Sequence, residues 1–335
     1  MLDWSRVTQV LTVATVAVCC TVLSAPGIVV AAEWKPDRVV EIIVATGAGG
    51  GQDKSARTVQ RILQDSKILS VTSTVQNKPG GGGLVAWNYL NQKGADGHFI
   101  AIANPTLLTN HITGRSSISY TDMTMIANLF TESVAISVRE DSPIRSIKDL
   151  SERLRKDVTS VSFSVGSSLG SANHIAMARL ARLSGADPRK MRAVVFQGGG
   201  QAMTALLGGH VDLIASAANN VVPHLQGGKL RVLGVTAEKR LEGSFANIPT
   251  LREQGADVVI SNGRMMVGAK AMTPPQVAYW EAALERMAAT AEWKKVIDDN
   301  EFEPLFMSSK DTQAYLKAQY AELKKALDDL GMAVK

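Results

Sequence analysis

Short β-branched runs alternate with helical patterns through most of the chain, and this alternation constrains the fold more than any other feature. Strands are predicted at Val39–Ala45, Val71–Gln76, Phe99–Ala103, Val134–Val138, Val161–Ser164, Ala193–Phe196, Leu213–Ser216 and Arg231–Thr236. Helices are predicted at Ser55–Gln64, Leu84–Gln92, Ser171–Leu183, Gln201–Leu207 and Val221–Gln226, and the chain is mostly helical from Pro274 onward. Strands alternating with helices of this length indicate an α/β protein whose parallel sheets are covered on both faces.

Two breaks interrupt this pattern. The stretch "SVREDSPIRSIKDL", Ser137–Leu150, is polar and marked by proline, and Ser146 is a suitable N-cap for a helix that follows it. A second break lies near "SFANIPTLREQGADV". Because the two ends of the chain resemble one unit, two breaks predict two lobes joined by two crossings.

The amino terminus has the form of an export signal. Arg6 supplies a positive charge before an apolar run, Val7–Val30, and small residues permit cleavage near Ala32. We therefore expect a signal peptide of residues 1–32 that is removed on export. A retained membrane anchor is the alternative, because the apolar run is long enough to span a bilayer.

Cysteine content and charge restrict the chemistry further. Both cysteines, Cys19 and Cys20, lie within the predicted signal peptide, so the cleaved protein would have no disulfide, cysteine nucleophile or cysteine-ligated metal. The chain carries 36 basic and 31 acidic residues, a mild excess of five positive charges. No basic stripe is interleaved with aromatic residues, so nucleic acid is not an expected partner.

Glycine-rich turns repeatedly leave a predicted strand and open a predicted helix. They occur at Gly47–Gly51, Gly80–Gly83, Gly166–Ser171 and Gly198–Gly200, and a polar "SAANN" turn follows the strand that ends at Ser216. Glycines allow the backbone N–H groups to approach an anion closely, and the helix that follows adds its unpaired amides and its dipole. Ligands bind at this edge of open α/β sheets. Four such turns therefore predict an anion site built from neutral donors.

Nucleotide-binding motifs do not fit the first of these turns. In "TGAGGGQDKS", Asp53 stands where a phosphate-binding loop needs glycine before Lys54-Ser55. The dinucleotide-binding pattern fails at its third glycine, which is Gln52 here. Asp53 is instead expected to be the N-cap of the helix, bonding amides near Ala56.

Catalytic and metal-binding motifs are also missing from the sequence. The histidines do not stand at metal-ligand spacing with carboxylates, and neither H-E-x-x-H nor G-x-S-x-G occurs. No metal, cofactor or catalytic residue is predicted. The rival interpretation is an exported hydrolase or transferase that uses Ser167 or Ser168 with His174.

The ordered set of motifs resembles the periplasmic substrate-binding proteins of tripartite tricarboxylate transporters, the Bug-type receptors. The resemblance runs from about Pro36 to the carboxyl terminus, and it rests on "AGGGQDKSAR", "NKPGGGG", "GADGHF", "VGSSLGSANH", "FQGGGQAMTALLGGHVDLI", "PHLQGGKLRVLGVTAEKR" and "IPTLREQG". The chain departs from the family pattern at Ala48, Phe196 and Gln197, and "NGRMMVGAKAM" lacks a tryptophan common in the family. These departures lie near the expected pocket wall, so they concern which ligand is bound.

The resemblance implies a two-lobed type II periplasmic-binding fold. Each lobe would be a mostly parallel sheet flanked by helices, and two crossover strands would form the hinge. One lobe would hold residues 33–132 plus 257–335, and the other would hold residues 133–256. No enzyme activity is implied.

The resemblance also implies a ligand site in the cleft between the lobes. Its expected residues are Gly49, Gly50, Gly51, Asp53, Gly82, Gly83, Asn104, Thr106, Ser167, Ser168, Gly198, Gly199 and Asn219. Asn104 and Thr106 also stand out unaided, because they form a polar pair at the end of the buried "FIAIA" strand. Arg264, after the glycine of "SNGRMM", is a candidate for a second carboxylate, with a surface role as the alternative.

The implied function is a periplasmic receptor, expected to be a monomer, that closes around a di- or tricarboxylate and delivers it to membrane permease subunits. The resemblance leaves open whether the ligand is citrate, a C4-dicarboxylate, an aromatic acid or an amino acid. A periplasmic sensor for a signalling kinase would use the same binding chemistry and is a further alternative.

Overall fold

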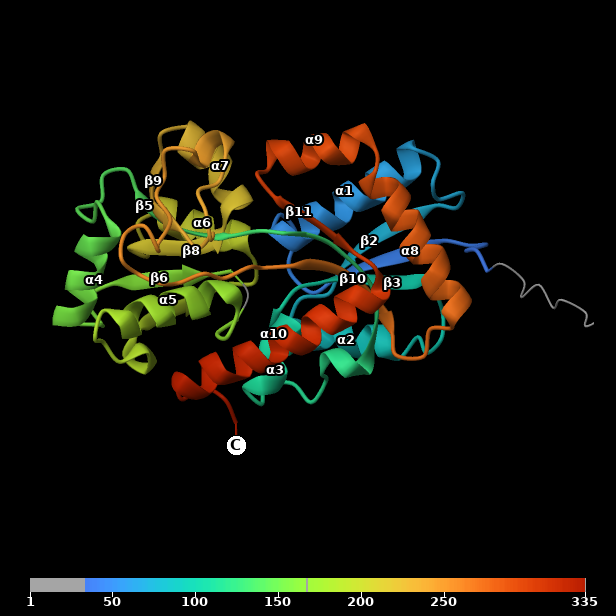
Figure 1. The fold of residues 1–335 in the computed structure, drawn as a ribbon, viewed down its shortest axis with the longest axis horizontal. Coiled ribbons are helices and arrows are strands. Elements are labelled where there is room, and N and C mark those ends of the chain that lie inside the picture. The colour runs from blue at the N-terminus through green and yellow to red at the C-terminus, as the bar shows by residue number, and fades with distance from the viewer. Residues whose placement is uncertain (1–33, 167, 335) are drawn as a thin grey trace, which may run out of the picture. The chain divides into compact units, whose positions relative to one another are not determined.

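The computed structural model describes residues 34–166 and 168–334. The predicted signal peptide and Ser167 lie outside the described residues. Within them the strands form two separate sheets, each flanked by helices on both faces (Figure 1). None of the helices in these ranges is long and apolar enough to cross a membrane.

The first sheet has six strands in the order β11-β4-β10-β3-β1-β2. These are β1 (Val40–Val44), β2 (Ser73–Asn77), β3 (Phe99–Ala103), β4 (Met123–Thr131), β10 (Arg264–Ala269) and β11 (Glu303–Met307). Strands β2 and β3 pair with β1 in parallel, whereas β10 is antiparallel to both β3 and β4, and β11 is antiparallel to β4. The sheet is therefore assembled from both ends of the described chain.

The second sheet has five strands in the order β7-β6-β8-β5-β9. These are β5 (Val134–Arg139), β6 (Ser162–Val165), β7 (Arg192–Val195), β8 (Leu213–Ala217) and β9 (Leu230–Val235). Strand β6 is parallel to β7 and β8, and β5 is antiparallel to β8 and β9. All five strands come from one continuous stretch of the chain.

Helices cover each sheet on both faces. They are α1 (Gly51–Asp65), α2 (Leu84–Asn91), α3 (Thr106–Ile112), α4 (Ile147–Lys156), α5 (Ala172–Leu183), α6 (Gly199–Leu207), α7 (Ala218–Gln226), α8 (Pro274–Ala288), α9 (Ala291–Asp299) and α10 (Ser309–Asp329), with short 3-10 turns η2 (Gly81–Gly83), η3 (Tyr120–Asp122), η4 (Pro188–Lys190) and η5 (Gly243–Phe245). In the first lobe, α1, α8 and α9 pack on one face and α2, α3 and α10 on the other. In the second lobe, α4 and α5 lie opposite α6 and α7.

The apolar spacing of the sequence explains how the helices dock. On α1, Val59, Ile62 and Leu63 are spaced by three and four residues, lie on one face and are fully buried against the sheet. On α4, Ile147, Leu150 and Leu154 repeat the same spacing, and the Ser146 side chain accepts a hydrogen bond from the Asp149 N–H, which confirms the predicted N-cap.

The predicted α/β class and two-lobed fold are confirmed, but the sheets are mixed and not mostly parallel. The antiparallel strands β4, β5 and β10 are the ones that lead to or from the crossings between the lobes. A chain that leaves one sheet and later returns to it can run against its neighbours, because no right-handed helical crossover links those strands. Strands β4, β10 and β11 were not among the predicted strands, and together they form the antiparallel part of the first sheet.

The crossing segments differ from the predicted polar break. The chain first crosses at Glu132 and Ser133, just before β5, whereas Ser137–Leu150 lies inside the second lobe. The crossing pairs with the returning one: Asn262 N–H donates to the Glu132 carbonyl at 2.9 Å, and Ser133 forms an isolated bridge with Ser261. In Figure 1 the two crossings, green and orange, run side by side. The backbone of these crossings is buried and hydrogen-bonded, so it does not require a polar or proline-rich sequence. The amino-acid composition therefore did not indicate where the chain crosses between the lobes.

Helix α10 connects the two lobes at a third place. Its Leu316 packs into the core of the first lobe, whereas its Leu327 forms a small buried cluster with Ile112 of α3 and Ile175 of α5. In Figure 1 this helix, drawn in red, extends from the first sheet toward α5. Helix α10 therefore adds an apolar contact between the lobes to the two hinge crossings.

Candidate functional site

A cavity of about 40 Å³ lies where the two lobes meet. It is lined by Thr46, Gly50, Gly51, Gln52, Asn104, Gly166, Asn173, Gly199, Ser216, Ala217, Asn220, Asn262 and Arg264. Most of these residues lie at or just after the carboxyl ends of β1, β3, β6, β7 and β8, which are parallel to a neighbouring strand, whereas Asn262 and Arg264 come from the return crossing and the start of β10. This is the edge at which open α/β sheets bind their ligands.

Three helices begin at this cavity without a side-chain cap. Gly50, Gly198 and Ala217 are the N-cap residues of α1, α6 and α7, and none of them makes a side-chain hydrogen bond to the first turn. By contrast, α4 and α5 are capped by Ser146 and Ser171. Uncapped first turns leave amide donors available, and each helix dipole adds partial positive charge at the same point. The cavity is therefore suited to an anion.

Glycines allow these helix ends to lie close together. A Cβ on Gly51 would be 3.1 Å from Nη2 of Arg264, and a Cβ on Gly166 would be 2.6 Å from Cα of Gly199. The second distance is shorter than real Cβ contacts allow. A larger residue at position 166 would therefore displace the start of α6.

Asp53 does not act as the predicted N-cap. Helix α1 begins at Gly51, two residues before Asp53, because the glycines accept the first-turn conformation without any side chain to place. The Asp53 carboxylate turns back to accept hydrogen bonds from Gly49 N–H at 2.9 Å, Asn77 Nδ2 at 2.9 Å and Arg57 Nε at 3.1 Å. These bonds outweigh the effect of burial and lower the pKa of Asp53, so its charge fixes the glycine loop.

Arg264 is a buried cation on the cavity wall, which contradicts the surface role considered for it. Its side chain is 3% exposed and forms an ion pair with Glu132, which is 1% exposed. Asn262 Nδ2 also donates to Oε1 of Glu132, at 3.0 Å. Burial raises the pKa of Glu132, although Arg264 and Asn262 act in the opposite direction. This cluster stands on the two hinge crossings.

Several polar atoms around the cavity have no hydrogen-bond partner within the described part of the chain. They are Thr46 Oγ1, Gln52 Oε1, Asn173 Oδ1, and Nε and Nη1 of Arg264. A buried polar group without a partner costs about 1–3 kcal/mol, and more when it is charged. Such a cluster on one cavity wall is typical of a site that binds a polar ligand.

The structure brings some of the predicted site residues together and separates others. Gly50, Gly51, Asn104 and Gly199 line the cavity. Gly49, Asp53 and Gly198 belong to the same turns but are not on its wall. The role of each of these residues in binding stays a prediction.

The remaining predicted residues lie elsewhere. Gly82 and Gly83 are outside the cavity wall and back onto Asn110 and Trp87, respectively. Asn219 lines a separate cavity of about 30 Å³. Thr106 and Ser168 are buried side chains that do not line the larger of these two cavities, and Ser167 is outside the described residues.

Other lining residues were not among the predicted site residues. They are Thr46, Gln52, Gly166, Asn173, Ser216, Ala217, Asn220 and Asn262, whereas Arg264 was already a candidate for a second carboxylate. Gly166 and Ser216 belong to turns that were predicted from the sequence, and Asn220 follows the predicted Asn219. The turns that contain these three residues were therefore predictable, although the residues themselves were not named. Asn262 reaches the cavity through the returning crossing, which had no such signal.

The rival hydrolase interpretation receives no support from His174. Its Nδ1 accepts a hydrogen bond from Gly170 N–H at 3.1 Å, and its ring stacks on Phe163. Burial, aided by the charge of Arg115, lowers the pKa of His174 to about 4. Ser168 Oγ has no hydrogen-bond partner among the described residues, so this histidine does not activate it. A ring held in this way is a poor general base near neutral pH.

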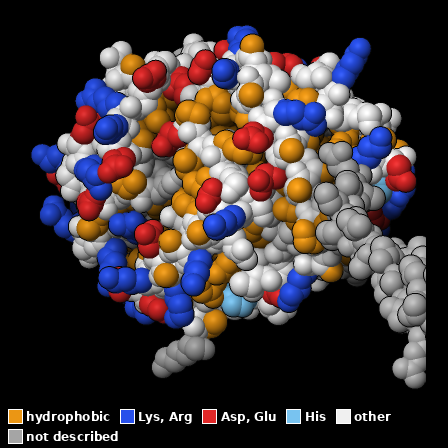
Figure 2. All heavy atoms as spheres, turned by 45° about the vertical axis from the view of Figure 1, so that its right-hand side comes forward, with side chains coloured by type: hydrophobic (Ala, Val, Ile, Leu, Met, Phe, Trp, Pro, Cys, Tyr) orange, Lys and Arg blue, Asp and Glu red, His pale blue; other side chains and the backbone are white. Residues whose placement is uncertain are grey.

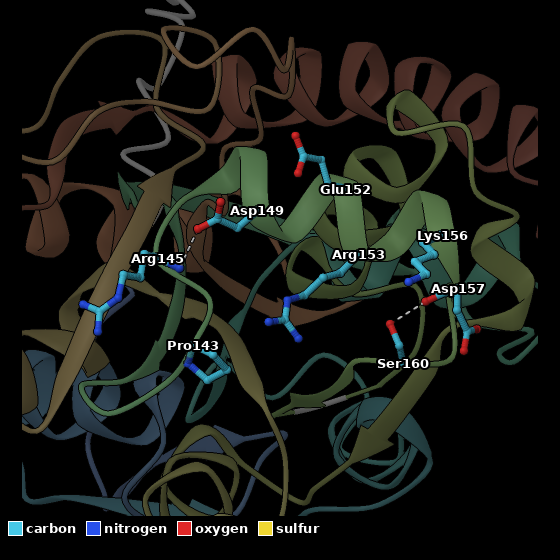
Figure 3. A pocket seen from close by; sticks show the side chains of 8 residues that line it. All are labelled: Pro143, Arg145, Asp149, Glu152, Arg153, Lys156, Asp157 and Ser160. Atoms are coloured by element: carbon cyan, nitrogen blue, oxygen red, sulfur yellow. Dashed lines mark hydrogen bonds between the residues drawn. The ribbon is translucent and has the colours of Figure 1, made fainter.

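A larger hollow of about 720 Å³ lies along α4, on the second lobe alone (Figure 3). Two of its carboxylates accept hydrogen bonds from nearby main-chain groups: Asp149 from Arg145 N–H, and Asp157 from Thr159 N–H. Its acidic and basic side chains are both numerous, and the face drawn in Figure 2 likewise intersperses charges of both signs. Among the described residues, no group of three or more His, Cys, Asp or Glu could hold a metal ion.

Comparison with solved structures supports the fold. The periplasmic binding protein BugD has a TM-score of 0.82 at 24% identity, and the alignment covers 90% of this chain and all of BugD. A TctC solute-binding protein from Polaromonas is 27% identical, with a TM-score of 0.64 and coverage of 88% of this chain and 99% of that protein. Both are periplasmic binding proteins with the two-lobed fold.

Sequence comparison identifies the family. Protein BugT of Bordetella pertussis is 26% identical over 276 residues, which is 81% of this chain and 82% of BugT. A protein encoded in the gbd 5′ region of Cupriavidus necator is 27% identical over 301 residues, which is 89% of each chain. The model of the tripartite tricarboxylate transporter family receptor matches residues 56–332. The chain is a solute-binding protein and belongs to the tripartite tricarboxylate transporter receptor family.

Proposed function

We propose that the protein captures a small organic acid, most favourably a di- or tricarboxylate, in the cavity between its lobes and delivers it to the permease subunits of a tripartite tricarboxylate transporter. The observation that carries this proposal is the convergence of three uncapped helix starts, those of α1, α6 and α7, on one cavity that also contains Arg264.

Binding would rest on main-chain donors. Helix N-termini from both lobes, at Gly51 and Gly199, would surround one carboxylate with N–H groups. Hydrogen bonds from neutral donors to an anion are strong yet reversible, which suits a receptor that must release its ligand. Two structural neighbours carry acids of this class: MatC from Rhodopseudomonas palustris was solved with malate, and a second R. palustris protein with adipate.

Capture requires the lobes to move apart. A cavity of about 40 Å³ is far smaller than the roughly 300–1,000 Å³ of ligand pockets. Direct contacts hold this arrangement: Gly47 N–H donates to the Gln197 carbonyl at 3.2 Å, Arg115 Nη1 donates to the Leu169 carbonyl at 3.0 Å, and Ser244 N–H donates to Oε1 of Glu301 at 2.6 Å. A ligand that bridges the lobes would favour closure only through contacts stronger in the closed state.

Titration calorimetry with malate, adipate and citrate tests the proposal. We expect saturable binding of at least one acid and none of its neutral methyl ester. Asn220→Ala should weaken binding about tenfold or more, because it removes a polar group from the wall. Asn88→Ala, an exposed asparagine on α2, is the matched control and should leave affinity unchanged. Saturable binding of none of the three acids would count against the proposal.

Cellular context forms part of the same proposal. Receptors of this family are periplasmic, so we infer that this chain is exported and that residues 1–32 are removed. We also propose that it acts as a monomer. Mass spectrometry of the protein from a periplasmic fraction should give an amino terminus near Ala32 or Glu33. Recovery of the intact amino terminus in membranes would instead support the retained anchor.

A further inference from the structure

We propose that Arg264 binds one acid group of the ligand and that Glu132 competes with the ligand for that guanidinium. This inference rests on the proposed function and deepens it, because it assigns a charged subsite and a built-in competitor to the cavity. The two residues face each other across the hinge: Glu132 stands on the outgoing crossing, and Arg264 begins β10 after the return crossing.

Arg264 has donors that Glu132 does not satisfy. A guanidinium carries five N–H groups in a planar fork. Nη2 contacts Oε1 of Glu132, and within the described part of the chain Nε and Nη1 have no partner. The side chain is 3% exposed and lines the cavity, so a ligand that enters from the cleft reaches a largely dehydrated cation.

Glu132 is likewise only half satisfied. Its Oε1 accepts from both Arg264 and Asn262, whereas Oε2 has no partner among the described residues. Within the cavity region the pair has no net charge when both groups are ionised. Glu132 therefore cancels much of the attraction that Arg264 would otherwise exert on an anion.

The groups around Glu132 leave few other ways to compensate its charge. Arg264 of β10 is the charge that faces it, and Asn262 is a neutral donor. On β11 the Glu303 carboxylate accepts a hydrogen bond from Ser133, so it adds negative charge near this crossing. A ligand carboxylate on Arg264 would place a further negative charge beside Glu132.

When two carboxylates share one guanidinium, their mutual repulsion raises the free energy of the state in which both are ionised. Ligand binding should therefore be accompanied by uptake of a proton on Glu132. Once protonated, the carboxyl group could donate a hydrogen bond through Oε2, which has no partner among the described residues. The affinity of wild-type protein should then fall as the pH rises from about 6 to about 8, a range in which free carboxylic acids are already ionised.

Calorimetry on three variants tests the proposal, with malate and adipate as the probes. Glu132→Gln keeps the shape and the acceptor oxygen but removes the charge. We expect it to bind at about pH 8 roughly tenfold or more tightly than wild type, and to lose the dependence of affinity on pH. Glu132→Gln/Arg264→Gln removes both charges together, so no buried charge is left alone, and it should bind more weakly than Glu132→Gln. Glu140→Gln, which removes a half-exposed partner of Arg231, is the control and should match wild type.

Wild-type protein provides a measurement that does not depend on any variant. Titrations in two buffers of different ionisation enthalpy give the number of protons taken up with the ligand, which should be above zero at about pH 7. Binding of an acid without proton uptake, or an unchanged or weaker affinity in Glu132→Gln, would overturn this inference alone. If neither probe binds wild-type protein, both the inference and its basis in the proposed function fail.

Discussion

At the scale of single residues, the site combines glycines that remove bulk with buried polar groups that lack partners. Gly51 and Gly166 stand where a Cβ would press on Arg264 or on the backbone at Gly199. Arg264 and Glu132 form an ion pair that is almost completely buried from solvent. Such groups reduce stability unless they are paired, so their concentration at one cavity is more readily explained by binding than by folding.

His174 gives a prediction on stability against pH. Its pKa is lowered to about 4 in the folded protein, against an ordinary value near 6.5 in the unfolded chain. Between these values the unfolded state binds more protons, so stability rises with pH through this window and is fully regained above it. The effect is about 3 kcal/mol. In His174→Asn, the free energy of unfolding should differ less between about pH 4.5 and about pH 7 than it does in wild type. Urea denaturation at the two pH values measures this difference.

The control for this prediction is His210→Asn, which removes another histidine of the same lobe. It should preserve the slope of stability against pH seen in wild type, because His210 is not one of the buried histidines. An equal slope in wild type and His174→Asn would show that the buried ring does not carry the effect.

At the scale of elements, the helices differ in how their first turns are capped. Ser146, Ser171, Thr290 and Ser308 cap α4, α5, α9 and α10. The starts of α1, α6 and α7 have no side-chain cap. Sequence periodicity predicted these helices well, since each must bury one apolar face. It placed the start of α1 too late, because a glycine at a helix start has no side chain to signal the position.

Adding a side-chain cap to α7 should raise the stability of the protein and lower its affinity for the ligand. Ala217→Ser places a hydroxyl at the N-cap, where it can accept a hydrogen bond from an amide of the first turn. We expect the free energy of unfolding to rise by up to about 1 kcal/mol, and affinity for the acid to fall because that amide is no longer free. Urea denaturation and calorimetry measure the two effects on one sample.

Ser146→Ala on α4 is the complementary change. It should lose about 1 kcal/mol of stability, because its bond to Asp149 N–H is removed, and it should bind the acid as wild type does. If Ala217→Ser strengthened binding, the free amides of α7 would not be ligand donors.

At the scale of the whole molecule, the lobes touch across a cavity too small for a ligand. This contact includes the hydrogen bond between Gly47 and Gln197, and α10 adds the apolar cluster around Leu327. The lobe boundaries predicted near residues 132 and 257 stay a proposal, although the first falls on the observed crossing between β4 and β5.

A disulfide across the lobes should lock the protein. A Cβ on Gly47 would lie 4.0 Å from Cβ of Gln197, within the range that disulfides need. Gly47→Cys/Gln197→Cys should oxidise readily, since the chain after residue 32 has no cysteine of its own. In the oxidised form, association of malate or adipate should slow by about a hundredfold or more, because opening precedes entry.

Reduction of the same sample should restore the wild-type rate of association, and Gly47→Cys alone should show no dependence on oxidant. Stopped-flow fluorescence or calorimetry can follow both forms. Rapid exchange of the acid in the oxidised protein would show that the cavity fills without separation of the lobes.

The sequence was sufficient to determine the α/β class, most helices and strands, and the turns that hold Gly50, Gly51 and Gly199, because these features depend on local periodicity and on backbone freedom that only glycine has. Tertiary structure decided which turns meet. It brought Asn262 and Arg264 from the return crossing to the first turn of α1 and left Gly82 and Gly83 outside the cavity. It also placed Glu132 against Arg264, a pairing of residues 132 positions apart. Local patterns cannot encode such a contact, because it arises only when two crossings of the chain pack together.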